Sequence, residues 1–89
     1  MPKVEIPPRY RGVTVGVKEV RVEAETVQAC LDAVDVVYPG FLELVVDSAG
    51  EIRKFVRLFL NGEELSRTTF DGPVDSDDVV SVVTGAAGG

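Results

Sequence analysis

The residues of this chain that could do chemistry are its last two. Gly88 and Gly89 follow Ala86 and Ala87, so the α-carboxylate of Gly89 sits on residues without branched side chains. A diglycine adds little to a fold, because glycine loses more backbone entropy on ordering than any other residue. Its use is access, since a backbone without Cβ enters slots that other residues cannot. We therefore expect Gly89 to be the reacting group, with Gly88 as the second half of the motif and Ala86 and Ala87 in contact with a partner.

Few other side chains could react. The chain has one cysteine, Cys30, and no histidine, so it can form neither an internal disulfide nor a zinc or iron–sulfur site of the usual ligand sets. Cys30 lies on the apolar stripe of a predicted helix and lacks a histidine base, so we interpret it as a core residue. The acidic residues Asp71, Asp75, Asp77 and Asp78 lack the spacing of an EF-hand and are interpreted as a solvated bend.

The terminal carboxylate would need activation from outside this chain. A carboxylate resists nucleophiles because its charge is shared by both oxygens, and converting it to an acyl-phosphate with ATP supplies a leaving group. Neither a G-x-x-x-x-G-K-[ST] loop nor G-x-G-x-x-G after a strand occurs here. We therefore expect no cofactor bound by this chain, with ATP and Mg held in an activating enzyme. A tail of five extended residues would reach about 17 Å into such a site.

The length and the net charge of the chain limit its possible domain organisation and its possible partners. With 89 residues, 45% of them apolar, the chain is expected to form a single domain over 1–84 followed by a flexible tail over 85–89. A net charge of −6 argues against nucleic acid and anionic membrane surfaces as partners and favours a protein with a basic docking surface. We see no membrane span and no signal peptide, so we expect a cytoplasmic protein.

The hydrophobic pattern predicts the elements that carry the tail. Apolar residues spaced by three and four predict a helix over 26–38, with Thr26 as its N-cap, and a short apolar segment follows at 41–45. Asn61-Gly62 predicts a tight hairpin, because both central positions of such a turn require positive φ. The strands are expected at 4–6, 17–23, 55–60, 63–65 and 79–84.

The helix is expected to pack on one face of the sheet. The predicted core consists of Val27, Cys30, Leu31, Val34, Val56, Leu58, Leu60, Val80 and Val82. Arg57 is the least suited to burial, so its face should point outward with Phe55 and Phe59 beside it. Aromatic residues around an arginine are typical of a protein interface. The alternative is that Tyr10, loop 41–50 or the residues after the hairpin cover one of these rings.

Residues 54–64 (KFVRLFLNGEE), Asp71-Gly72, residues 78–83 (DVVSVV) and the closing Ala87-Gly88-Gly89 resemble the ThiS/MoaD family of sulfur carriers. The resemblance implies an α+β fold, the ubiquitin-like β-grasp, with a mixed sheet of four to five strands and one main helix on one face. It also implies that an adenylating, E1-like enzyme activates Gly89, that sulfur displaces AMP to give a thiocarboxylate, and that a synthase accepts this sulfur.

The resemblance implies a protein co-substrate rather than an enzyme, either alone or as the small subunit of a molybdopterin-synthase-like complex. The longer loops at 9–16 and 46–53 look more like those of carriers in molybdopterin or cysteine synthesis than those of thiamine synthesis. Two other classes stay open. As a covalent modifier, the chain would transfer its activated glycine to lysines, and as a non-covalent module it would bind through the Phe55/Arg57/Phe59 face with an inert tail.

Overall fold

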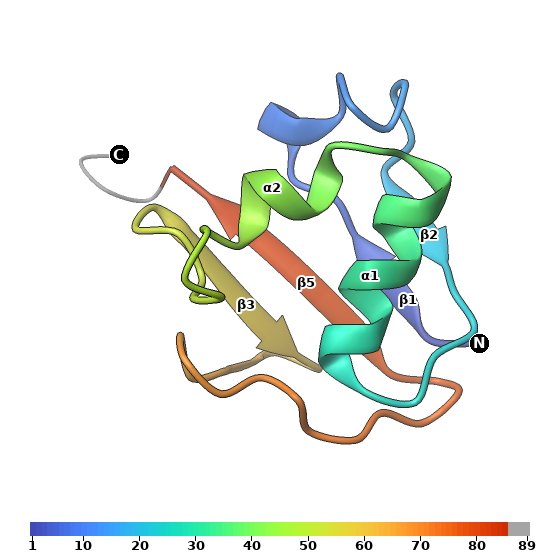
Figure 1. The fold of residues 1–89 in the computed structure, drawn as a ribbon. Coiled ribbons are helices and arrows are strands. Elements are labelled where there is room, and N and C mark those ends of the chain that lie inside the picture. Colours follow the sequence, from blue (N-terminus) through green and yellow to red (C-terminus); the bar gives the residue numbers. More distant parts are fainter. Residues whose placement is uncertain (86–89) are drawn as a thin grey trace.

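The computed structural model describes residues 1–85 and contains one mixed five-stranded sheet in the order β2-β1-β5-β3-β4. Its strands are β1 (Lys3–Glu5), β2 (Glu19–Arg21), β3 (Val56–Leu60), β4 (Glu63–Glu64) and β5 (Val79–Thr84). The helices are η1 (Pro8–Tyr10), a single 3₁₀ turn, α1 (Val27–Val37) and α2 (Phe41–Val45). Figure 1 shows β5 running through the middle of the sheet toward the C-terminal end.

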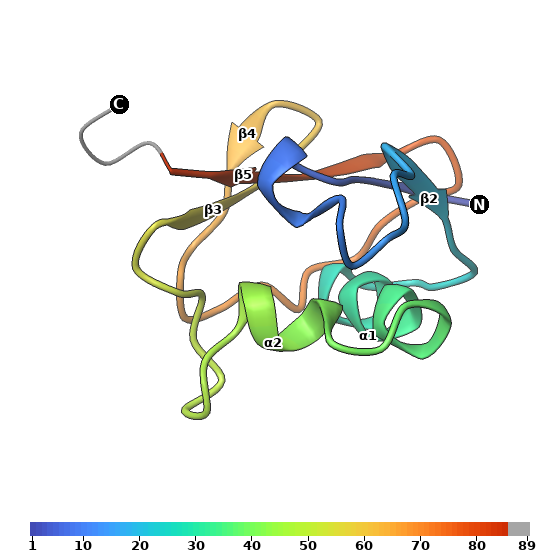
Figure 2. The same ribbon diagram turned by 90° about the horizontal axis from the view of Figure 1, so that it is seen from above.

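Strand β5 joins the two halves of the sheet. It pairs in parallel with β1, from Lys3 opposite Val79 to Glu5 opposite Ser81. On its other side it pairs antiparallel with β3 along the whole length of that strand. Both α-helices lie on one face of the sheet, as the edge-on view in Figure 2 shows, and within residues 1–85 no α-helix covers the other face. The predicted α+β architecture, with one main helix packed on one face, is thereby confirmed.

The main helix forms where the apolar spacing predicts it. Thr26 is its N-cap, and its hydroxyl accepts a hydrogen bond from the Ala29 N–H at 3.0 Å. The helix buries Val27, Cys30, Leu31 and Val34 against the sheet. The short segment at 41–45 was expected only as an apolar stretch, and it forms α2 instead. Five residues are too few to display a helical period, so the sequence pattern could not reveal this helix.

The hairpin between β3 and β4 is the tight turn that Asn61-Gly62 predicts, since φ is +49° at Asn61 and +88° at Gly62. The Asn61 side chain does more than accommodate the turn. Its amide nitrogen donates to the Asp78 carboxylate at 2.9 Å, and its carbonyl oxygen accepts from the Val79 N–H at 2.9 Å. Asn61 thus joins the hairpin to the start of β5.

The predicted strand at 17–23 is shortened to Glu19–Arg21, because β1 offers only three residues for pairing. The other predicted strands agree with the structure to within one residue at each end. Eight of the nine predicted core residues are buried, and Leu60 is half-buried against the same cluster. The core also contains residues that were not predicted: Val4, Ile6, Val22, Phe41, Val45, Ile52, Phe70 and Val74.

Candidate functional site: where the tail leaves the sheet

The C-terminal tail leaves the domain from its central strand. Thr84 is the last residue of β5 and lies opposite Val56 at the start of β3. The N–H of Gly85 then donates to the Phe55 carbonyl at 3.0 Å, and the backbone of Gly85 has φ of +68°, a conformation that favours glycine. The first residue of the predicted tail is therefore held by the domain. The predicted site residues Ala86, Ala87, Gly88 and Gly89 lie outside the described residues.

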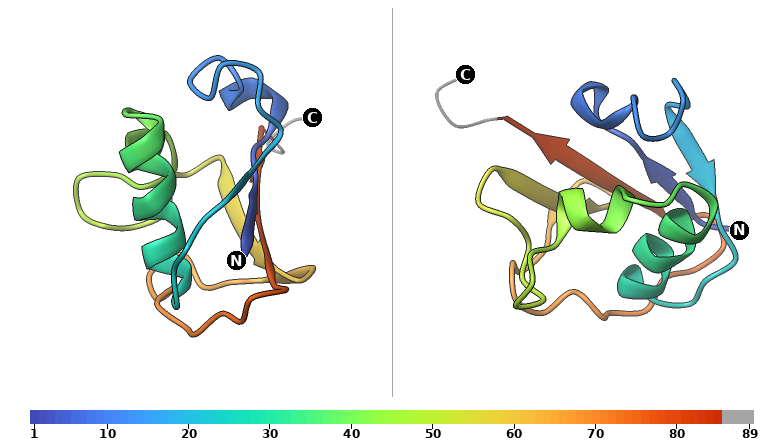
Figure 3. Two further views of the ribbon diagram at one scale, coloured as in Figure 1. Left: turned by 90° about the vertical axis from the view of Figure 1, so that its right-hand side faces the viewer. Right: turned by 45° about the horizontal axis from the view of Figure 1, so that its top comes forward.

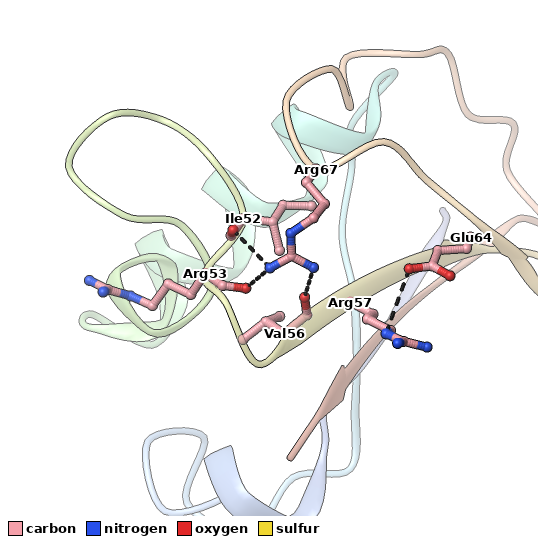
Figure 4. Close-up of polar contacts among 6 residues, drawn as sticks. All are labelled: Ile52, Arg53, Val56, Arg57, Glu64 and Arg67. Atoms are coloured by element: carbon pink, nitrogen blue, oxygen red, sulfur yellow. Dashed lines mark hydrogen bonds and ion pairs between the residues drawn. The ribbon is translucent and has the colours of Figure 1, made fainter. Parts of the chain in front are cut away.

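One arginine, Arg67, stabilises the turn before β3 that contains Phe55, the residue whose carbonyl binds the Gly85 N–H. The Arg67 guanidinium donates to the carbonyls of Val56 at 2.8 Å and Ile52 at 3.1 Å, and also to the carbonyl of Arg53 (Figure 4). The Ile52 N–H donates in return to the Arg67 carbonyl at 2.9 Å. Arg67 thus fixes the backbone of residues 52–56, immediately before the strand that pairs with β5. Sequence reasoning missed this residue, because carbonyl acceptors leave no pattern of residue types.

The predicted interface residues lie on the helix-free face, but not as a uniform patch. Phe55 precedes β3 and is 52% exposed, with the Lys54 ammonium 5.5 Å from the centre of its ring. Arg57 is exposed and pairs with Glu64 at 3.7 Å, whereas Phe59 is half-buried. In the described residues the alternative of a covered ring therefore does not hold for Phe55, whereas Phe59 is partly covered. Tyr10, one of the proposed covering residues, packs against the core instead.

The structure adds one apolar residue to this face. Val83 lies directly opposite Arg57 on β5 and is 39% exposed. The alternation of β5 contains the signal that would have found it, since Val80 and Val82 point inward and their neighbours must point outward. The exposed apolar surface near the tail is therefore formed mainly by Phe55 and Val83, with Arg57 between them and Phe59 as a half-buried continuation.

The surroundings of Cys30 and of the acidic bend at Asp78 indicate structural roles for both. Cys30 is fully buried on α1, and this burial, followed by the charge of Asp78, raises the pKa of its thiol. Asp78 belongs to the acidic bend before β5, where hydrogen bonds from the Asp75 backbone and from the Asn61 amide lower the pKa of its carboxyl group. Both observations agree with the interpretation of a core cysteine and a solvated bend.

Within residues 1–85 no group of three or more histidine, cysteine, aspartate or glutamate side chains is arranged to hold a metal ion. In the same part of the chain, no helix has the length and apolar character needed to cross a bilayer.

The sheet order, the helices on one face and the tail leaving the central strand define a ubiquitin-like β-grasp protein. The model of the ThiS family matches residues 4–89. The chain therefore belongs to the ThiS family of ubiquitin-like sulfur carrier proteins, as its resemblance to ThiS/MoaD predicts. The matched range extends over the diglycine.

Solved structures support the same fold. The chain is similar to one in the crystal structure of the Amycolatopsis orientalis BexX/CysO complex, with a TM-score of 0.88, 25% identity and all of both chains covered. It is also similar to CysO of Mycobacterium tuberculosis, with a TM-score of 0.82, 24% identity and coverage of 94% of this chain and 98% of that one. For SAMP1 of Haloferax volcanii the TM-score is 0.74 at 21% identity, with 99% and 98% covered. Comparison with curated protein sequences finds no match.

Proposed function

We propose that this protein carries sulfur as a thiocarboxylate on the carboxyl group of Gly89. An ATP-dependent, E1-like enzyme adenylates that group, a sulfur donor converts it, and a synthase of the molybdopterin, cysteine or thiamine type accepts the sulfur. The observation that carries this proposal is the family match, which runs from the first strand through Gly89 and so includes both the fold and the diglycine.

The chemistry requires two successive exchanges at one carbonyl carbon. A Gly89 carboxylate oxygen attacks the α-phosphorus of ATP, pyrophosphate leaves, and an acyl-adenylate remains. A sulfur nucleophile then attacks the carbonyl carbon, the acyl–oxygen bond to AMP breaks, and the thiocarboxylate forms. The carrier contributes no acid or base to either step. It is a protein co-substrate, and ATP and Mg are bound by the activating enzyme in the cytoplasm, where ATP is available.

The geometry of the tail exit supports delivery of Gly89 to another protein. Gly85 is fixed to the Phe55 carbonyl, so the tail starts from a defined point at the edge of the domain. The four residues beyond it span at most about 13 Å when extended. The partner must therefore come close to the end of the sheet where β5 finishes. Phe55, Arg57 and Phe59 lie near this end and are available for contact. In such a complex, Ala86 and Ala87 would contact the partner at the entrance to its active site.

The test is reconstitution with a purified E1-like enzyme, ATP, Mg and a sulfide source, followed by intact-protein mass spectrometry. The expected product is heavier by the replacement of one oxygen with one sulfur, and a variant lacking Gly89 should stay unchanged. Conjugates to lysines of other proteins, without the sulfur product, would instead favour a covalent modifier. If a bound partner were found with neither product, the chain would be a non-covalent module and the proposal would be wrong.

A further inference from the structure

Positive charge gathers where the tail leaves the sheet, although the chain as a whole is acidic. The Nη1 atom of Arg9 lies 3.8 Å from the position that a Cβ on Gly85 would occupy. Arg11 and Lys18 line the same surface groove as Thr84, the residue before Gly85.

Lys54 completes this group from the other side of the exit. It directly precedes Phe55, whose carbonyl binds the Gly85 N–H, and its side chain is exposed. We call these four residues, Arg9, Arg11, Lys18 and Lys54, the basic rim. The right-hand view of Figure 3 shows η1 beside the C-terminal end of β5, while the segment after η1 continues toward β2.

Hydrogen bonds hold Lys18 and Arg11, and the segment that carries Arg9, on the folded domain. The Ile6 N–H donates to the Lys18 carbonyl at 2.8 Å, and the Ile6 carbonyl accepts from the Arg11 side chain Nε at 3.1 Å. The Tyr10 hydroxyl donates to the Leu44 carbonyl at 2.9 Å, which ties η1 to α2 and positions the neighbouring Arg9. The rim is thus built on the folded domain.

Within residues 1–85, no acidic side chain forms an ion pair with a rim residue. The ion pairs there are Lys3 with Glu19 at 3.6 Å and Arg57 with Glu64 at 3.7 Å, and neither uses a rim residue. The groove does contain two carboxylates, Glu5 and Glu19. Glu19 is the partner of Lys3, and Glu5 accepts a hydrogen bond from the Ser81 hydroxyl at 2.7 Å while keeping its charge. The four rim cations therefore outnumber the two carboxylates of the groove. Like charges placed together repel one another, and no ion pair of a rim residue offsets this repulsion in residues 1–85, so the placement of the rim favours a role in binding.

The opposite end of β5 carries the opposite charge. Asp75, Asp77 and Asp78 form the bend that leads into the strand, and Glu23 and Glu25 line a groove together with Asp75. Figure 1 shows this bend at the start of β5, away from the C-terminal end of the strand that leads to Gly85. The net charge of −6 therefore conceals a separation of charge along the central strand, with the tail at the basic end.

We propose that the basic rim docks against an acidic protein surface surrounding the entrance to the activating enzyme's active site. This inference rests on the proposed function and names the chemistry of the surface that recognises the carrier. It reverses, for this end of the molecule, the expectation of a basic partner that net charge alone suggests. An acidic entrance attracts the rim and repels the far end of the carrier, so that association and orientation of the tail are favoured together.

The first experiment compares two charge reversals of equal size. Arg9→Glu alters the rim, whereas Arg21→Glu alters an exposed arginine on β2, which pairs with β1 at the end where the acidic bend lies. The readout is the association rate constant with an E1-like enzyme that adenylates the unaltered carrier. We expect Arg9→Glu to lower this constant on the order of tenfold at low salt. The difference should disappear at 1 M salt, where the Debye length is about 3 Å.

Equal effects of the two reversals would overturn the basic rim while leaving the proposed function intact. Failure of the unaltered carrier to be adenylated would instead count against the proposed function. For that reason the rim is also tested without an enzyme. Short poly-L-glutamate, titrated at low salt, should shift the backbone amide NMR signals of residues 9–18 and 84–85 but not those of 75–78. No shift at 9–18, or shifts there only with a single-stranded oligonucleotide, would overturn the proposal.

Discussion

Arg67 offers the sharpest test of how the tail exit is held, through the substitution Arg67→Met. Methionine keeps much of the length and packing of the side chain but removes every donor to the carbonyls of Ile52, Arg53 and Val56. Hydrogen bonds from a charged donor contribute about 1.5–3 kcal/mol each when buried. Arg67 is only half-buried and water can replace part of the interaction. At about 1 kcal/mol per bond, we expect a total loss of about 3 kcal/mol.

For a domain of this size, such a loss lowers the melting temperature by roughly 10–20 °C. The matched control is Arg57→Met, and Figure 4 shows Arg57 in the same view as Arg67. Arg57 is exposed and its ion pair with Glu64 spans 3.7 Å. Pairs of this kind contribute about 0–1 kcal/mol, so the control should melt within a few degrees of the unaltered protein.

The assay is thermal unfolding followed by circular dichroism, combined with hydrogen exchange at Gly85. Because residues 52–56 would lose their support, exchange of the Gly85 amide, which donates to the Phe55 carbonyl, should become faster in Arg67→Met alone. Similar melting temperatures for the Arg67 and Arg57 variants would refute the argument that carbonyl contacts of one side chain support the exit.

Three further predictions concern the core, the tail and the acid limb of stability. Leu58→Asp places a carboxylate at a fully buried site and should abolish cooperative unfolding in urea at neutral pH. Gly88→Val should prevent adenylation without changing the melting temperature, whereas Gly72→Val, at an open glycine far from the tail, should still be adenylated; full adenylation of both would contradict the access argument. Because the pKa of Asp78 is lower in the folded state, its carboxylate contributes stability above the ordinary value of 3.8 that disappears as the pH falls through the lowered pKa. Asp78→Asn should therefore be less stable at neutral pH and lose less stability on acidification, as measured by urea midpoints across that range.

The sequence predicts elements well where the pattern is regular and long. The helix at 26–38 shows several apolar repeats, and Asn61-Gly62 permits few turn geometries, so both are confirmed. Core residues such as Ile52 and Phe70 lie in irregular segments, where no period separates inside from outside. Their burial depends on the path of the loops over the core, which the pattern does not encode.

The candidate site, like the fold, could be predicted from the sequence only in part. The diglycine and the outward face of β3 can be identified from residue types, because glycine pairs and exposed aromatic residues have few structural uses. Residue types do not identify Arg67 or the basic rim. Arg67 acts through backbone carbonyls, and the rim unites Lys54 with residues about forty positions earlier in the chain, a proximity that only the fold creates. Net charge alone gives no sign of the rim, because the acidic residues outnumber the basic ones over the whole chain.

The parallel pairing of β1 with β5 would have a mechanical consequence if another protein drew in the tail, as the proposed function requires. A pull on Gly85 acts along the axis of β5, and the hydrogen bonds to β1 and β3 run across that axis. The load is therefore shared by both flanking ladders at once and is not concentrated on one bond after another, as it would be if the strand were peeled from an edge. We therefore expect the domain to stay folded when a force is applied repeatedly to its C-terminal end.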